Sequence, residues 1–95
     1  MEEVGMKRTP LAAGNWKMHK TLPEALDLLE DLRDGLQPIK GVEKLVCPPY
    51  IALEAAERIL SGSSIQVGAQ NVFWENEGAY TAEISPVMLK DLCIY

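Results

Sequence analysis

The stretch that decides the fold is Leu11-Ala12-Ala13-Gly14-Asn15-Trp16, followed at positions 21–36 by TLPEALDLLEDLRDGL. The first run follows a proline and is too short for a helix, which is typical of a strand buried on both faces. Thr21 and Glu24 have the spacing of a capping box, so we expect a helix to begin here and to end at Gly35. The apolar residues of this segment recur at spacings of three and four, which predicts one apolar stripe on a helix: Leu22, Ala25, Leu26, Leu29, Leu32 and Leu36.

The alternation of strand and helix continues along the rest of the chain. Short apolar runs bounded by proline, glycine or serine indicate strands, and longer periodic runs indicate helices. This alternation predicts a parallel sheet with right-handed crossovers. The expected elements are a strand at 44–47 that two prolines end, a helix at 52–60, a strand at 65–69, an irregular segment at 70–83, a short helix from Pro86 to Leu92 capped by Ser85, and a fourth apolar run at 93–95.

The pattern therefore gives an α/β class but leaves its architecture open. Doubly wound sheets and (β/α)8 barrels share the same local alternation. An open parallel sheet needs helices on both faces, and this chain has few helices to supply them. A dinucleotide-binding turn is excluded, because Gly14 is followed by Asn15-Trp16-Lys17 without a second glycine.

Composition predicts at most one domain and excludes several classes of partner. The chain has 95 residues, 47% of them hydrophobic and 24% charged. We expect residues 1–10 to form an N-terminal tail and residues 11–95 to form the folded part. Fourteen acidic residues outweigh nine basic ones, the formal net charge is -5, and the basic residues form no cluster. We therefore expect no nucleic acid or membrane partner, no membrane span and a cytoplasmic location.

The cysteines give no sign of metal or redox chemistry. Cys47 and Cys93 lie far apart in apolar segments, without metal-ligand spacing. The run Cys47-Pro48-Pro49-Tyr50 lacks the second cysteine of a redox pair. Two buried thiols are predicted.

The candidate binding residues are Asn15 and Lys17, at the end of the first predicted strand. Side chains two apart on a strand point the same way, so an amide and a cation would converge at the strand's carboxyl end. Ligands bind at that end of parallel α/β sheets, and this pair suits an anionic, oxygen-rich small molecule. The alternative is that Lys17 is a solvated loop lysine and Asn15 caps a turn, and spacing alone favours this alternative.

Four motifs in order along the chain resemble the triosephosphate isomerase family. The first lies at the end of the first predicted strand and contains both candidate residues. The order and spacing of the four together are far more specific than any one of them. They are Gly14-Asn15-Trp16-Lys17-Met18, Val46-Cys47-Pro48-Pro49, Val67-Gly68-Ala69-Gln70-Asn71 and Gly78-Ala79-Tyr80-Thr81-Ala82-Glu83-Ile84-Ser85-Pro86.

The resemblance implies a (β/α)8 TIM barrel, of which this chain supplies roughly the first three and a half strand–helix units. It implies the interconversion of dihydroxyacetone phosphate and glyceraldehyde 3-phosphate through an enediolate, in glycolysis and gluconeogenesis, without metal or organic cofactor. Lys17 would stabilise negative charge as a catalytic and substrate-binding residue, and Asn15 would orient substrate and help to place Lys17. His19 is expected at a surface or interface, because the family's histidine motif would begin past Tyr95 and its glutamate base lies later still.

The long segment 70–83 is expected to make a subunit contact. It contains Phe73, Trp74 and Tyr80, and aromatic side chains are enriched at interfaces. In the family this loop enters the neighbouring subunit, which implies a homodimer, or assembly with a complementary C-terminal chain; the alternative is that the aromatics fold back on their own barrel. The expected interface residues are Met18, Tyr80, Thr81 and Glu83, with a structural pairing role for Glu83. Ala82 replaces a glycine common in the family, which puts the local backbone angle in question.

Two functions remain. The chain is part of a triosephosphate isomerase that is inactive alone, or it is a non-catalytic half-barrel that serves as a structural or oligomerisation module. Its first and last strands would lack neighbours, and free strand edges recruit other chains. We therefore expect the isolated chain to associate.

Overall fold

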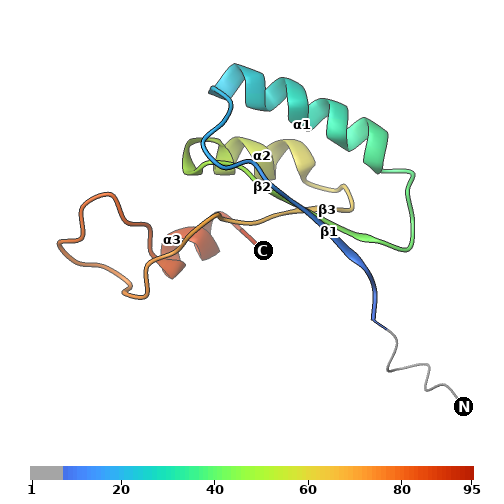
Figure 1. The fold of residues 1–95 in the computed structure, drawn as a ribbon. Helices are drawn as coiled ribbons and strands as arrows, with labels where there is room; N and C mark the ends of the chain where they lie inside the picture. Colours follow the sequence, from blue (N-terminus) through green and yellow to red (C-terminus); the bar gives the residue numbers. More distant parts are fainter. Residues whose placement is uncertain (1–7) are drawn as a thin grey trace, which may run out of the picture.

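The computed structural model describes residues 8–95 and contains one parallel sheet with its helices (Figure 1). Residues 1–7 of the predicted tail lie outside the described residues. The sheet order is β1-β2-β3, and both neighbouring pairs are parallel, as predicted. The elements are β1 (Leu11–Asn15), α1 (Leu22–Leu36), β2 (Glu43–Cys47), the 3-10 turn η2 (Tyr50–Ala52), α2 (Leu53–Leu60), β3 (Ile65–Val67) and α3 (Pro86–Asp91).

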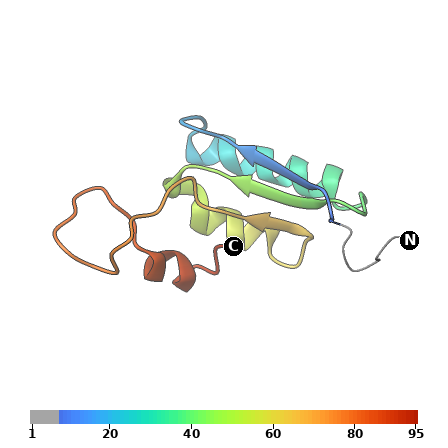
Figure 2. The ribbon, with the colours of Figure 1, turned by 60° about the horizontal axis from the view of Figure 1, so that its bottom comes forward.

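Both long helices cover the same face of the sheet (Figure 2). Leu29 of α1 and Leu53 of α2 are buried in one apolar cluster with Val46 of β2 and Val67 of β3. Successive side chains of a strand point to opposite faces of the sheet, so every second residue lies under the helices. A doubly wound sheet would divide its helices between the two faces, so helices on a single face favour the barrel.

The prediction that the first strand is buried on both faces is wrong. Leu11 to Asn15 are all exposed, because β1 is an edge strand with no neighbour beyond it among the described residues. Ala12 and Gly14 are in register with Lys44 and Val46, but they are too small to fill the space under α1. An apolar hollow of ≈ 490 Å³ remains there.

Helix α1 begins as predicted but does not end at Gly35. The Thr21 N–H donates to the Glu24 Oε1 at 2.9 Å, so the capping box is confirmed. The helix continues to Leu36, and Gly35 keeps a negative φ. The ammonium of Lys44 caps this end, because it donates to the carbonyl of Leu36 at 2.8 Å and to that of Ile39, in the connection after the helix, at 2.6 Å.

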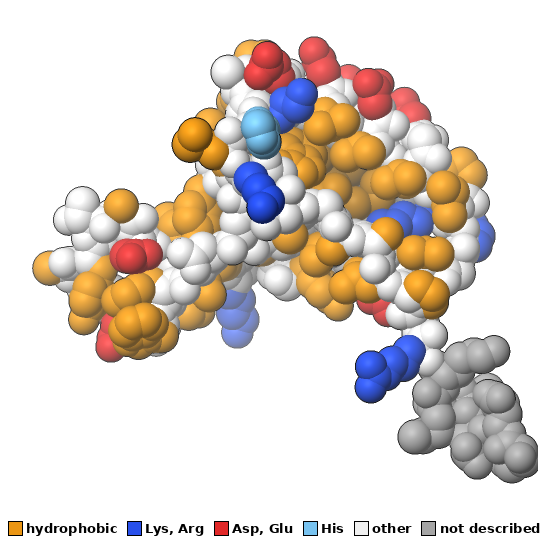
Figure 3. All heavy atoms as spheres, in the orientation of Figure 1, with side chains coloured by type: hydrophobic (Ala, Val, Ile, Leu, Met, Phe, Trp, Pro, Cys, Tyr) orange, Lys and Arg blue, Asp and Glu red, His pale blue; other side chains and the backbone are white. Residues whose placement is uncertain are grey.

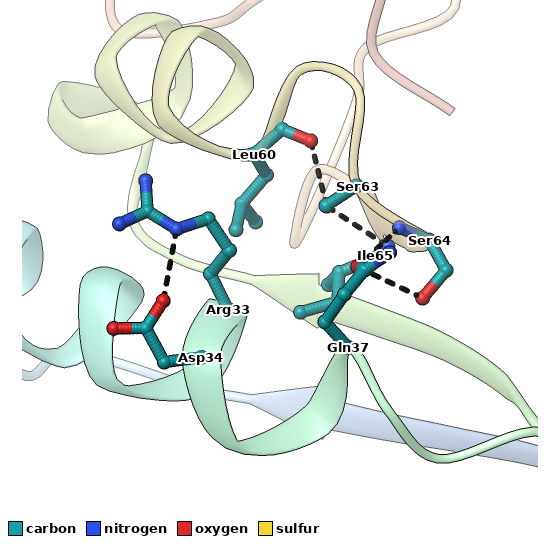
Figure 4. A network of polar contacts seen from close by, with 7 residues as sticks. All are labelled: Arg33, Asp34, Gln37, Leu60, Ser63, Ser64 and Ile65. Carbon is teal, nitrogen blue, oxygen red and sulfur yellow. Dashed lines mark hydrogen bonds and ion pairs between the residues drawn. The ribbon is translucent and has the colours of Figure 1, made fainter.

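The amino end of the sheet is closed by a polar network. Lys44 is only 5% exposed and makes its third hydrogen bond to the Ser64 Oγ at 2.9 Å. Gln37 accepts from the Ser64 N–H at 3.0 Å, so the end of α1 is attached to the turn before β3 (Figure 4). In the same turn the Ser63 hydroxyl donates to the Leu60 carbonyl at 2.7 Å and accepts from the Ile65 N–H at 3.1 Å (Figure 4). These hydrogen bonds satisfy polar groups of the connection after α1 and of the turn before β3.

The remaining elements differ from prediction mainly at their ends. The second helix starts one residue later than predicted, after η2, and β3 ends at Val67 instead of residue 69. Ser85 caps α3 as predicted, since its Oγ accepts from the Met88 N–H at 3.3 Å. Residues 93–95 form no strand, but the Tyr95 N–H donates to the Val67 carbonyl at 2.7 Å and so lies beside β3. Within residues 8–95, no helix combines the length and apolar character needed to cross a membrane.

Candidate functional site at the carboxyl end of the sheet

The three strands end next to one another at Asn15, Cys47 and Val67. Their backbones are held together beyond the last ladder positions. The Trp16 N–H donates to the Cys47 carbonyl at 3.1 Å, and the Gly68 N–H donates to the Val46 carbonyl at 2.9 Å. The segments that follow the strands are therefore fixed against the sheet where they begin.

Asn15 and Lys17 do lie together, but not for the predicted reason. The strand ends at Asn15, and Lys17 has a left-handed backbone with φ 56°, so the two residues do not alternate along one strand. Instead the Asn15 Oδ1 accepts from the Lys17 N–H at 2.9 Å, which makes a tight side-chain turn. A left-handed backbone costs a residue other than glycine about 1 kcal/mol, so these contacts must hold Lys17 in place.

Gln70 is a third member of the site, and the sequence analysis did not single it out. It follows β3, and its Nε2 donates to the Lys17 carbonyl at 2.9 Å and to the Cys47 carbonyl at 2.8 Å. Both partners are acceptors, so only the amide nitrogen can face them. Its position in the sequence could have identified it, because Gln70 comes shortly after the third strand, as Lys17 comes shortly after the first.

The side chain of Lys17 is exposed, and within the described part of the chain its ammonium makes no hydrogen bond. His19 and Lys20 follow it and are also exposed; His19 thus lies on the surface, as expected. Figure 3 shows the histidine on the same face as cationic side chains, in a chain whose net charge is -5. A cation available at the carboxyl end of a parallel sheet suits an anionic ligand.

Two titratable groups near the site, Cys47 and Tyr50, have raised pKa values, which favours their neutral forms. Burial raises the pKa of the Cys47 thiol, although a hydrogen bond from the Gly68 backbone opposes the shift. Burial also raises the pKa of Tyr50, and the charge of Glu83 adds to this shift. The prediction of two buried thiols is wrong, because Cys47 is half-buried and Cys93 is exposed. Cys93 lies in the turn after α3, where the described residues provide no further strand to cover it.

Residues 70–83, here called the aromatic loop, project away from the sheet (Figure 1). The Phe73 N–H donates to the Ile84 carbonyl at 2.8 Å and closes the loop at its base. The ring centroid of Phe73 lies 4.3 Å from that of Trp74 and 4.5 Å from that of Tyr80. Trp74 is nevertheless 79% exposed, so the aromatics pack mainly on one another.

Ala82 occupies a left-handed conformation with φ 74°. This is the position at which the resemblance put the local backbone angle in question. The left-handed angle is present although the residue is alanine. The aromatic loop therefore carries local strain that a glycine would relieve.

Parallel strands with both long helices on one face, and a lysine held at their carboxyl end, define a protein of the (β/α) barrel class. The family model of triosephosphate isomerase matches residues 10–95, and the chain belongs to this family. A triosephosphate isomerase of Dehalococcoides mccartyi is 53% identical over 88 residues, which cover 93% of this chain and 35% of that protein. One of Caldanaerobacter subterraneus subsp. tengcongensis is 52% identical over 85 residues, with 90% and 34% covered.

The crystal structure of triosephosphate isomerase from Bartonella henselae matches with a TM-score of 0.83 at 38% identity. The match covers 92% of this chain and 35% of that one. The fold is therefore the N-terminal part of a TIM barrel, from β1 to residues 93–95, which lie beside β3 without forming a strand. The chain spans about a third of the length of the relatives it matches.

Proposed function

We propose that this chain supplies the first part of a triosephosphate isomerase that interconverts dihydroxyacetone phosphate and glyceraldehyde 3-phosphate. The observation that carries the proposal is the ammonium of Lys17, which is exposed at the carboxyl end of the sheet within a chain that matches the family over residues 10–95. The reaction belongs to glycolysis and gluconeogenesis, and we propose a cytoplasmic location.

In this proposal Lys17 acts through its positive charge and takes part in no proton transfer. An ammonium near the oxygens of a phosphorylated triose stabilises the negative charge of the bound substrate and of the enediolate. Asn15 contributes to substrate orientation and to the placement of Lys17, consistent with the hydrogen bond from the Lys17 N–H to its side chain. We propose that other polypeptide supplies the glutamate that removes a carbon-bound proton and the histidine that shuttles protons between the oxygens, as the resemblance implies. The chain by itself is therefore expected to be inactive.

Fragment complementation tests this proposal. The chain is mixed with the C-terminal portion of the Dehalococcoides mccartyi relative that begins where the match to this chain ends, and conversion of glyceraldehyde 3-phosphate is followed. We expect isomerase activity from the mixture and none from either part. Lys17→Ala should lower the recovered kcat/KM by at least about 100-fold, as expected for loss of a preorganised charge.

Lys20→Ala is the matched control, because Lys20 lies in the same exposed segment and also has a left-handed backbone, with φ 82°. It should leave most of the recovered rate. If Lys17→Ala and Lys20→Ala have equal effects, the assignment of Lys17 is wrong. If the mixture folds into a stable complex without isomerase activity, the chain is better described as a structural half-barrel.

We further propose that the aromatic loop contacts a second subunit in a homodimer, or a complementary C-terminal chain. The loop region contains Glu75, Glu77 and Glu83 but no lysine or arginine between residues 70 and 83. Its charge complements the basic segment 17–20, in which Met18 is 93% exposed. Opposite charges around exposed apolar side chains support a contact in which Tyr80, Thr81 and Glu83 approach Met18 of the other subunit.

Sedimentation of the isolated chain and of the complemented mixture tests this partner assignment. We expect the isolated chain to associate and the mixture to form a dimer that Trp74→Glu weakens. Glu54→Ala, on the exposed side of α2, is the control and should not change the dimer. A monomer at every concentration, or equal weakening by both variants, would contradict the proposed interface.

A further inference from the structure

We infer that the side chains of Asn15 and Gln70 form an amide clamp that fixes the left-handed backbone of Lys17, and that Gln70 is a positioning residue for the Lys17 ammonium. The inference deepens the proposed function, on which its consequence for catalysis rests. The effect of Asn15 and Gln70 on the backbone conformation of Lys17 does not depend on the proposed function.

The two amides hold opposite sides of one residue. Asn15 accepts from the Lys17 N–H at 2.9 Å, and Gln70 donates to the Lys17 carbonyl at 2.9 Å. Both backbone polar groups of Lys17 are thus used, although the strand ladder ended two residues earlier. With both groups held, the peptide planes on either side of the Lys17 Cα are fixed, and so is the direction of its Cα–Cβ bond, from which the side chain starts.

Gln70 also connects Lys17 to the rest of the sheet. The second proton of its Nε2 donates to the Cys47 carbonyl at 2.8 Å, and this carbonyl accepts from the Trp16 N–H at 3.1 Å. The contacts therefore join the ends of β1, β2 and β3. Because the nitrogen has two protons and both are used, a side chain without donors cannot replace it.

The clamp predicts opposite requirements at its two ends. Position 15 must supply an acceptor, and position 70 must supply a donor. Asn15→Asp keeps an oxygen that can accept from the Lys17 N–H, whereas Gln70→Glu, ionised near neutral pH, offers only acceptors to two carbonyls. Two substitutions of the same chemical kind should therefore have different effects on Lys17.

The test is NMR on the labelled 95-residue chain assembled with the complementary C-terminal portion, because the isolated chain is expected to associate. It uses the one-bond Cα–Hα coupling of Lys17, which reports the sign of φ. We expect the positive-φ value in the unchanged chain and in Asn15→Asp, and a change to the negative-φ value in Gln70→Glu. Lowering the pH until the new carboxyl is protonated restores one donor and should return part of the original signal. Gln66→Glu is the matched control, because Gln66 is exposed on β3 and should leave Lys17 unchanged.

Other outcomes are equally decisive. If Gln70→Glu leaves the Lys17 coupling unchanged, or if Gln66→Glu changes it as much, the clamp is wrong. Should Gln70→Glu lose its dispersed amide signals, Gln70→Ala gives the same information, because alanine removes both donors without adding charge.

The catalytic part is tested in the complemented enzyme. There Gln70→Ala should lower kcat/KM by about 10-fold to 100-fold, the size expected when a catalytic group is displaced by roughly an ångström. A changed Lys17 coupling with unchanged kcat/KM would overturn the positioning role of Gln70. If even the unchanged chain recovers no isomerase activity, the proposed function fails, while the NMR result still decides the clamp.

Discussion

The two ends of the sheet use their lysines in opposite ways. At the amino end, the ammonium of Lys44 is buried and makes three hydrogen bonds to α1, to the connection after it and to the turn before β3. At the carboxyl end, the backbone of Lys17 is held by two side chains, while its ammonium is exposed. The first arrangement uses a charge to stabilise structure, and the second uses structure to present a charge.

The backbone angles differ between the two ends as well. At the amino end the turns with positive φ use glycine, Gly41 at 80° and Gly62 at 83°. At the carboxyl end Lys17, Lys20 and Ala82 take left-handed angles without being glycine. Gly78, at 151° in the aromatic loop, and Cys93, after α3, are exceptions to this division. Strain of this kind persists only where surrounding contacts impose it, and it gathers at functional sites.

The largest expected effect concerns the amino end. Lys44→Met keeps an unbranched side chain of similar size but leaves the carbonyls of Leu36 and Ile39 without their charged donor, so it should lower the free energy of unfolding by about 2–4 kcal/mol. Urea unfolding measures this change. Lys40→Met is the control, because Lys40 is exposed, and should change stability by less than about 0.5 kcal/mol. If the two substitutions change the free energy of unfolding equally, Lys44 has no special structural role.

A smaller effect of opposite sign is expected at the carboxyl end. Ala82→Gly removes the Cβ that disfavours φ 74° and should raise the free energy of unfolding by about 1 kcal/mol. Ala79→Gly, in the same loop but without a left-handed angle, should lower it by about 0.5 kcal/mol through the added freedom of the unfolded chain. Thermal unfolding of the pair tests whether the loop is strained. A loss of stability in both variants would show that it is not.

The smallest effect is a dependence on pH at the start of α1. Hydrogen bonding from the Thr21 backbone N–H, and then from its side chain, lowers the pKa of Glu24 below the ordinary value of 4.5. The folded state thus favours the ionised form, so this contribution is present above the ordinary pKa and is lost as the pH falls through the lowered one. Glu24→Gln keeps an acceptor but cannot ionise.

The two chains are compared by urea unfolding between about pH 6 and about pH 3. The stability advantage of the glutamate chain over Glu24→Gln should shrink as the pH falls. A difference that stays constant over this range would show that the Glu24 charge does not contribute to the cap.

Much of this fold could be predicted from local chemistry, and the failures have physical causes. The capping box of α1, the Ser85 cap and the parallel alternation depend on residues near one another in sequence, and all are confirmed. The cap at the end of α1 comes from Lys44, which lies in the next strand, so no local rule could predict it. The exposure of β1 depends on what lies beside the strand, which its own composition does not encode.

The candidate site shows the same division. Sequence placed Asn15 and Lys17 at one end of the sheet, and they are there, but strand alternation gave the wrong reason for their proximity. Gln70 lies 53 positions from Lys17, and no periodicity connects them. Only the resemblance suggested a catalytic role for Lys17, because a solvated lysine and a substrate-binding lysine have the same local sequence.

The order of the strands in the sheet, β1-β2-β3, is also their order in the chain. Each new strand is therefore added at the growing edge, and none has to be inserted between two that have already paired. As the ribosome releases the chain, β2 can dock as soon as α1 has formed, and β3 can follow once α2 is complete. The N-terminal strand–helix units can thus assemble in the sequence in which they are synthesised, with each unit providing the template for the next.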